Sequence, residues 1–223
     1  MAADDRRLKE VFEAYAVKNT WNNAESKSGP GSTLLYTVNL RSQLRVFVEK
    51  FEIRSIFDAP CGDFNWMQAM EFPEGTTYIG GDIANTLVDR NKTKYSGTGR
   101  EFIEFNVVSD RFPASDVWFC RDCFFHLPFI DIFHALHNFV KSDIKYLMMT
   151  NHINSLNFRN GNATIGGFRL LDFFIEPFCL PREILFRIAD YVHPHPQREM
   201  CVWTREQVSD VMQGMAYRVL TAG

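Results

Sequence analysis

The sequence predicts an α/β fold with a mainly parallel sheet, and two observations lead to this prediction. After residue 50 the hydrophobic pattern changes repeatedly between the alternation of strands and the spacing of amphipathic helices, which is typical of strand–helix–strand units. Two last strand-like segments are separated by the turn-rich residues 193–197, so we expect them to pair as an antiparallel hairpin. The expected architecture is a Rossmann-like three-layer sandwich on a seven-stranded sheet, preceded by N-terminal helices.

Each expected element follows from its local pattern. The strands are expected at residues 55–58, 77–82, 101–106, 116–120, 145–150, 184–191 and 199–203. The helices are expected at 7–18, 33–50, 65–70, 85–94 and 130–140. Gly, Pro and Ser predict loops at 19–32 and 155–181, and a loop as long as the second is usually functional. We expect one domain over 1–223, with 1–50 as a helical cap and lid loop and 51–223 as the core.

Composition places the chain among ordinary globular proteins. Its 223 residues are 46% hydrophobic, with a formal charge of -3 and a pI near 6.1. This balance gives no basic excess for holding a nucleic-acid backbone. No apolar run is long enough for a membrane span or a signal segment. We therefore expect a cytoplasmic protein without nucleic-acid or membrane partners.

The five cysteines are an odd number, which does not describe a disulfide framework. Cys120 and Cys123 form a C-x-x-C pair, but no second pair and no histidines at zinc spacing accompany it. Neither a zinc site nor a redox motif is expected there.

A ligand site is expected where the first strand turns into the following segment. The strand ends at Asp58, and the turn through Pro60 to Gly62 points backbone N–H groups outward, which suits a polar or anionic group. The second strand ends at Asp82, which is suited to accept hydrogen bonds from ribose hydroxyls. A turn with a capping acid and no ligand is the plain alternative. A dinucleotide site would need G-x-G-x-x-G, of which one glycine is present.

These motifs resemble a known family. The segments Asp58-Ala-Pro-Cys-Gly62-Asp-Phe-Asn-Trp66 and Tyr78-Ile-Gly-Gly-Asp82-Ile look like motifs I and II of class I S-adenosylmethionine-dependent methyltransferases, in a subgroup whose first motif reads D-x-P-C-G-D-F-x-W. The segments 21–32 and 120–128 also look like that subgroup, so the likeness covers about residues 12–180.

The resemblance implies S-adenosylmethionine as cofactor, S-adenosylhomocysteine as product, and a set of cofactor contacts. The methionine moiety would be lined by Asp58, Ala59, Pro60, Cys61 and Gly62. Asp82 would hold the ribose, Ile83, Asn106 and Val107 would meet the adenine, and the backbone of Cys120 and Arg121 would pass under the sulfonium. From the residues themselves we expect Arg41 to pair with the cofactor carboxylate, and the loop from Ser28 to Ser32, with Trp21, to close over the cofactor.

Catalytic side chains are expected beyond the carboxyl ends of the fourth and fifth strands. Asp122 and His126 follow the fourth strand, and Asn151 and His152 follow the fifth. His126 or His152 would act as general base, and Asp122 would orient it or take the proton itself. The alternatives are a core imidazole for His126, a solvated loop for His152 and a capping or Arg-paired carboxylate for Asp122.

The acceptor site is expected to include Asn151, Phe168 and Arg169, the last two from the long loop. Carboxylate, amide and imidazole could also ligate a divalent metal, but no second carboxylate follows the fifth strand, so metal dependence is not favoured.

The acceptor itself is judged by exclusion and by likeness. The N/D-P-P-aromatic signature of base-modifying enzymes is replaced by Cys-Arg-Asp-Cys, and no catalytic Lys flanked by acids is found. A small-molecule or glycan hydroxyl remains, and the resemblance suggests O-methylation of a saccharide. A metal-dependent small-molecule methyltransferase, an NAD(P)-dependent reductase and a catalytically silent cofactor-binding module stay open, as does the choice between monomer and homodimer.

Overall fold

The computed structural model describes residues 3–221, with side chains described for residues 6–214. Within this range the strands form one seven-stranded sheet in the order β3-β2-β1-β4-β5-β7-β6. The strands are β1 (Ser55–Asp58), β2 (Thr77–Asp82), β3 (Arg100–Glu104), β4 (Val117–Cys120), β5 (Tyr146–His152), β6 (Phe186–Ala189) and β7 (Arg198–Thr204). The helices are α1 (Ala3–Lys18), α2 (Val38–Lys50), α3 (Asn85–Tyr95), α4 (Phe129–Val140) and α5 (Arg205–Thr221). The predicted Rossmann-like α/β architecture is confirmed.

The sheet is parallel except at β7. Every neighbouring pair within β3-β2-β1-β4-β5 is parallel, while β7 pairs antiparallel with both β5 and β6. Asp58, the last residue of β1, lies opposite Gly80 of β2 and Phe119 of β4. The carboxyl ends of these three central strands therefore meet at one edge of the sheet, where open α/β sheets bind ligands.

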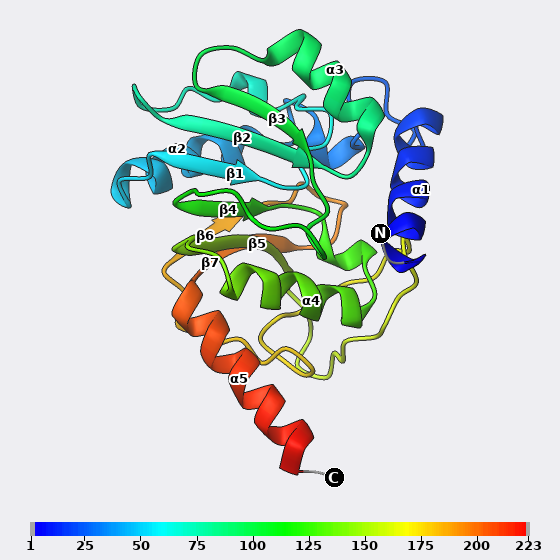
Figure 1. Cartoon of the computed structure of the whole chain (residues 1–223), viewed down its shortest axis with the longest axis vertical. Coiled ribbons are helices and arrows are strands. Elements are labelled where there is room, and N and C mark those ends of the chain that lie inside the picture. The colour runs from blue at the N-terminus through cyan, green and yellow to red at the C-terminus, as the bar shows by residue number, and fades with distance from the viewer. Residues whose placement is uncertain (1–2, 222–223) are drawn as a thin grey trace.

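Helices cover both faces of the sheet and produce the three layers visible in Figure 1. Successive residues of a strand point to opposite faces. Phe57 and Trp118 accordingly pack in the cluster that contains α4, whereas Ile56 and Phe119 pack in the cluster that contains α2. Phe57 is completely buried, and burying one such side chain contributes roughly 1.5–3 kcal/mol.

Two predicted helices differ from the structure near the site. The helix expected at 65–70 is only a 3-10 turn, Met67–Ala69. The helix expected from residue 33 begins at Val38. Its first turn is replaced because side chains take up the backbone donors there: the N–H of Leu34 bonds the Glu25 carboxylate, and the N–H of Tyr36 bonds the Thr33 hydroxyl.

The long loop predicted at 155–181 is confirmed, because the segment 153–185 crosses from β5 to β6 without a helix. Other parts of the C-terminal half differ from the prediction. β5 continues through His152, two residues beyond its expected end, because it pairs with β7 as far as His152 opposite Arg198. The helix α5 was not predicted. No helix of the described chain is long and apolar enough to cross a membrane.

Candidate active site

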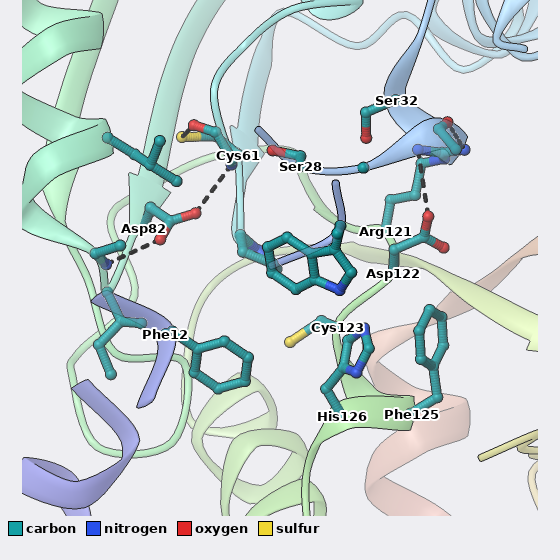
Figure 2. Close-up of a pocket in the computed structure, with 18 of the residues that line it drawn as sticks. Phe12, Ser28, Ser32, Cys61, Asp82, Arg121, Asp122, Cys123, Phe125 and His126 are labelled. Carbon is teal, nitrogen blue, oxygen red and sulfur yellow. Dashed lines mark hydrogen bonds and ion pairs between the residues drawn. The ribbon is translucent and has the colours of Figure 1, made fainter. Parts of the chain in front are cut away.

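A cavity of about 350 Å³ opens at the carboxyl ends of β1, β2 and β4. Figure 2 shows Cys61, Ser28 and Ser32 on one side of it and Cys123, Phe125 and His126 on the other. Its volume and its mixture of apolar walls with a few polar groups are typical of small-molecule sites. The predicted site residues that line it are Trp21, Ser28, Ser32, Asp58, Pro60, Cys61, Gly62, Asp82, Ile83, Asn106, Val107, Arg121, Asp122, His126 and Phe168.

The turn after β1 is fixed to the end of β2 by hydrogen bonds. The N–H of Gly62 donates to Oδ2 of Asp82 at 2.9 Å, and the N–H of Ala84 donates to Oδ1 at 2.9 Å. The amide of Asn91, from α3, donates to the carbonyl of Gly62 at 2.8 Å. Gly62 has φ +56°, in the left-handed region that favours glycine. Both oxygens of Asp82 are thereby oriented, and each retains a lone pair for a further donor such as a hydroxyl.

Burial raises the pKa of both acids in this part of the cavity. Asp82 is buried, and its pKa rises to about 6 while the N–H groups of Ala84 and Gly62 oppose the shift. The pKa of Asp58 rises to about 8, again chiefly through burial, although the hydroxyl of Tyr78 donates to it at 2.6 Å. At neutral pH Asp82 is therefore mainly ionised and Asp58 mainly protonated.

A second group of charges closes the opposite end of the cavity. Arg121 donates bidentately to the buried Asp190, with distances of 2.7 and 3.0 Å. Asp122 forms ion pairs with Nη2 of Arg198 at 3.0 Å and with Nη1 of Arg121 at 3.4 Å. Although burial of Asp122 opposes it, the charges of Arg121 and Arg198 lower the pKa of this carboxyl. Asp122 is therefore held as an ion-paired carboxylate, which makes it a weak base.

His126 lies in the cavity wall with its ring held by the backbone. Its Nδ1 lies 2.9 Å from the carbonyl oxygen of Gly167, a contact that fixes the proton on Nδ1 and leaves Nε2 as an acceptor. Burial lowers the pKa of His126, opposed by the Gly167 carbonyl and the negative charge of Asp122. The imidazole is thus neutral near pH 7. Aromatic rings surround it, with Trp21 at 5.9 Å and Phe168 at 6.2 Å between ring centroids.

His152 and Asn151 do not reach the cavity, which corrects their predicted roles as base and acceptor contact. Both lie inside β5 and are almost fully buried. Nδ1 of His152 accepts from the N–H of Leu171 at 3.1 Å, and the amide oxygen of Asn151 accepts from the N–H of Phe173 at 2.7 Å. They satisfy the backbone of the long segment 153–185, and burial lowers the pKa of His152 to about 4.

Four other predicted contacts also lie outside the cavity lining. Arg41 is not among the lining residues, and its Nη2 donates to the carbonyl of Leu34 at 3.0 Å. Arg169 donates to the carbonyls of Phe124 and Gly161 and anchors the long segment instead of forming the acceptor lip. The remaining two, both buried, are Ala59 and Cys120.

The structure adds cavity residues that the sequence analysis missed. Tyr36, Trp66, His195 and Arg198 all line the cavity. The guanidinium of Arg198 lies over the ring of Tyr36, 5.2 Å from its centroid, and His195 packs edge-on against the same ring at 5.4 Å. Arg198 reaches the cavity because β7 runs antiparallel to β5 and so begins at the edge of the sheet where β5 ends. Nothing in the local pattern marks Tyr36.

The described side chains include no group of three His, Cys, Asp or Glu residues arranged to hold a metal ion. The C-x-x-C pair consists of free, buried thiols, and burial raises the pKa of Cys120 far above its ordinary value. A protonated, buried thiol is a poor nucleophile.

Comparison with known proteins identifies the fold. No protein-family model and no curated protein sequence matches this chain. Among solved structures, magnesium protoporphyrin IX methyltransferase from Synechocystis PCC 6803 with bound SAM aligns with a TM-score of 0.59 at 12% identity, covering 91% of this chain and 97% of that one. Human N-acetylserotonin methyltransferase in complex with SAM aligns at 0.53 and 11% identity, covering 75% of this chain and 52% of that one, so this chain spans about half the human protein.

A third similar structure is the N-terminal domain of EvdMO1, obtained in the presence of SAH and D-fucose. It aligns with a TM-score of 0.53 at 14% identity, covering 75% of this chain and 83% of that one. At such identities the likeness concerns the fold alone, and the chain has the Rossmann-like fold of these methyltransferases.

Proposed function

We propose that this protein is an S-adenosylmethionine-dependent methyltransferase that O-methylates a sugar or glycan hydroxyl, with His126 as general base. The observation that carries the proposal is the position of His126: a neutral imidazole with a free Nε2 lines the same cavity as the paired turn and acid at Gly62 and Asp82. The proposed cofactor site and the proposed general base therefore line the same cavity.

The residues at the ends of β1, β2 and β3 fit the cofactor. Asp82 has both oxygens oriented and can accept from ribose hydroxyls, as acids at this position of α/β folds do. Ile83, Asn106 and Val107 line the adjoining wall and would contact the adenine. The turn before Gly62 would hold the methionine part.

In the reaction His126 handles the proton. When bound, S-adenosylmethionine supplies a methyl group on a positively charged sulfur and leaves as the neutral thioether. Nε2 of His126 accepts the proton of the acceptor hydroxyl as its oxygen forms the new bond to the methyl carbon. The ionised Asp122 stabilises the imidazolium through its charge. Nδ1 stays bonded to the Gly167 carbonyl throughout, so the ring keeps its orientation.

The cavity mouth supports a ring-shaped acceptor. Phe168 is 61% exposed at the mouth, and its ring lies 5.4 Å from that of Phe125. Together with Trp21 and Phe12 it presents aromatic faces, on which the apolar face of a sugar ring can pack. Small aromatic acceptors would use the same faces, so the acceptor panel must contain both.

We expect the protein to be cytosolic and to act as a monomer or a homodimer. Four of its five cysteines are buried and all five are free, which fits a reducing compartment.

A methyl-transfer screen tests the proposal. Purified protein is incubated with radiolabelled S-adenosylmethionine and a panel of nucleotide sugars, free glycans and small phenols, with and without EDTA. We expect label in a saccharide, insensitive to EDTA, and a loss of about 10²–10⁴-fold in His126→Ala. The exposed His134, on the outer side of α4, supplies the control variant His134→Ala. Transfer to phenols alone, or full activity in His126→Ala, would contradict the proposal.

A further inference from the structure

The lid, residues 26–32, forms one wall of the cavity. Its residues that line the cavity are Ser28, Gly29, Pro30, Gly31 and Ser32. The chain enters the lid through a tight turn, in which the side chain of Asn23 accepts from the N–H groups of Glu25 and Ser26. The lid is thus an ordered part of the cavity wall.

The buried carboxylate of Asp63 accepts three hydrogen bonds from the lid. Its Oδ2 accepts from the N–H of Lys27 at 2.6 Å. Its Oδ1 accepts from the hydroxyl of Ser26 at 2.9 Å and from that of Ser28 at 3.3 Å. Asp63 itself is only 3% exposed. Hydrogen bonds to an ionised acceptor are about twice as strong as neutral ones, so this cluster is a strong attachment.

The same residue connects the lid to the turn at Gly62. The N–H of Asp63 donates to Oγ of Ser28 at 3.0 Å. A Cβ on Gly62 would overlap that Oγ, so a larger residue there would displace the Ser28 side chain of the lid. The backbone N–H of Gly62 meanwhile bonds Asp82. The lid and the ligand-facing turn therefore meet in one hydrogen-bonded cluster around Asp63.

Two hydrogen bonds hold the C-terminal end of the lid. Arg121 donates to the carbonyl of Gly31 at 2.8 Å, and the amide of Asn65 donates to the carbonyl of Ser32 at 3.0 Å. These bonds hold the lid's backbone oxygens, whereas Asp63 holds its hydroxyls and an N–H.

We propose that Asp63 is a positioning residue: its carboxylate fastens the lid over the cavity and sets how fast the bound ligand leaves. The ligand's identity rests on the proposed function, but the fastening of the lid does not. A neutral amide at this position cannot replace the carboxylate, because its NH₂ group would face one of the lid's donors.

The first test measures the lid without any ligand. Amide hydrogen exchange is followed at Lys27, Ser28 and Gly29 in wild type and in Asp63→Asn. We expect exchange about ten- to hundred-fold faster in the variant, as the loss of one or two charge-assisted bonds implies. Glu71→Gln, at a side chain that is 90% exposed, is the matched control and should leave exchange unchanged.

A second variant covers the case in which Asp63→Asn fails to fold. Ser26→Ala leaves the turn intact but removes the hydroxyl that donates to Asp63 and accepts from the N–H of Ser28. It should accelerate lid exchange in the same direction by about tenfold. Unchanged lid exchange in Ser26→Ala and in folded Asp63→Asn would overturn the proposal.

The second test measures ligand exchange. Dissociation of S-adenosylhomocysteine, followed by stopped-flow displacement, should be faster in Asp63→Asn and in Ser26→Ala by the factor seen for the lid. An unchanged dissociation rate beside faster lid exchange would overturn the role of Asp63 in ligand release. If wild type binds no S-adenosylhomocysteine, the proposed function fails, and the lid-exchange test still judges whether Asp63 fastens the lid.

Discussion

Replacing Gly62 by alanine tests the contact between the lid and the ligand-facing turn. The backbone cost of an L-residue in the left-handed region is roughly 1–2 kcal/mol. The new methyl would lie 2.1 Å from Oγ of Ser28, which must move and break its hydrogen bonds with the backbone and carboxylate of Asp63. Each broken bond costs about 0.5–1.5 kcal/mol, so we expect Gly62→Ala to destabilise the fold by about 2–5 kcal/mol.

A matched glycine separates the backbone cost from the steric one. Gly75 also has a positive φ, +80°, but a Cβ there would meet nothing within 4 Å. Gly75→Ala should cost only about 1–2 kcal/mol in urea unfolding. Ser28→Gly removes the same two hydrogen bonds, so the double variant Gly62→Ala/Ser28→Gly should cost less than the sum of the two single variants. Equal costs for Gly62→Ala and Gly75→Ala, or additive costs in the double variant, would be the contrary result.

Three further predictions concern pH and the acceptor. Methyl transfer at saturating substrate should rise as pH increases through a pKa below 6.5, because burial lowers the pKa of His126 and its neutral form is the base. A midpoint above pH 6.5 in the rate profile would contradict this. Asp58 binds its proton more tightly in the folded state, with a pKa of about 8. Relative to Asp58→Asn, wild type should therefore lose up to about 1.4 kcal/mol of unfolding free energy per pH unit as the pH rises from 4 to 8. Parallel pH profiles of the two proteins in urea unfolding would contradict this. Phe168→Ala should raise the KM for the acceptor about tenfold or more without changing the affinity for S-adenosylhomocysteine. Leu156 is fully exposed in the same segment, so the control variant Leu156→Ala should change neither quantity. Equal KM values in the two variants would be the contrary result.

The sequence predicted the sheet and its ligand-binding edge because both are encoded locally. The two strands beside the predicted site, β1 and β2, are short segments that each end in an acid, Asp58 and Asp82. The turn at Gly62 needs a residue that tolerates a positive φ, and a glycine at this position in the sequence indicates such a turn.

The errors arose where contacts between distant segments decide the local structure. Residues 65–70 have a helical pattern, but the Asn65 side chain is bonded to Glu25 and to Ser32 of the lid, and only a 3-10 turn remains. His152 follows the fifth strand in the pattern, but pairing with β7 extends that strand and turns His152 into a partner for the backbone of Leu171. Tertiary pairing overrode local preference in both cases.

The candidate site was predicted best where side chains follow the central strands. His126 and Asp122 lie beside the cavity as expected, because β4 is central to the sheet. Arg198 was missed, since its position depends on the order in which β7 joins the sheet. That order becomes apparent only once the strands are placed.

We propose that Asp82 and the turn at Gly62 hold S-adenosylmethionine, and isothermal titration calorimetry with S-adenosylhomocysteine measures this binding. We predict one ligand bound per chain at pH 7.5, with an affinity that falls as the pH drops through about 6 and Asp82 becomes protonated. Binding should be weakened about tenfold or more in Asp82→Ala. The control variant Asp89→Ala, at an exposed residue, should bind as wild type does. The absence of binding heat in wild type at several temperatures, or undiminished affinity in Asp82→Ala, would contradict the claim.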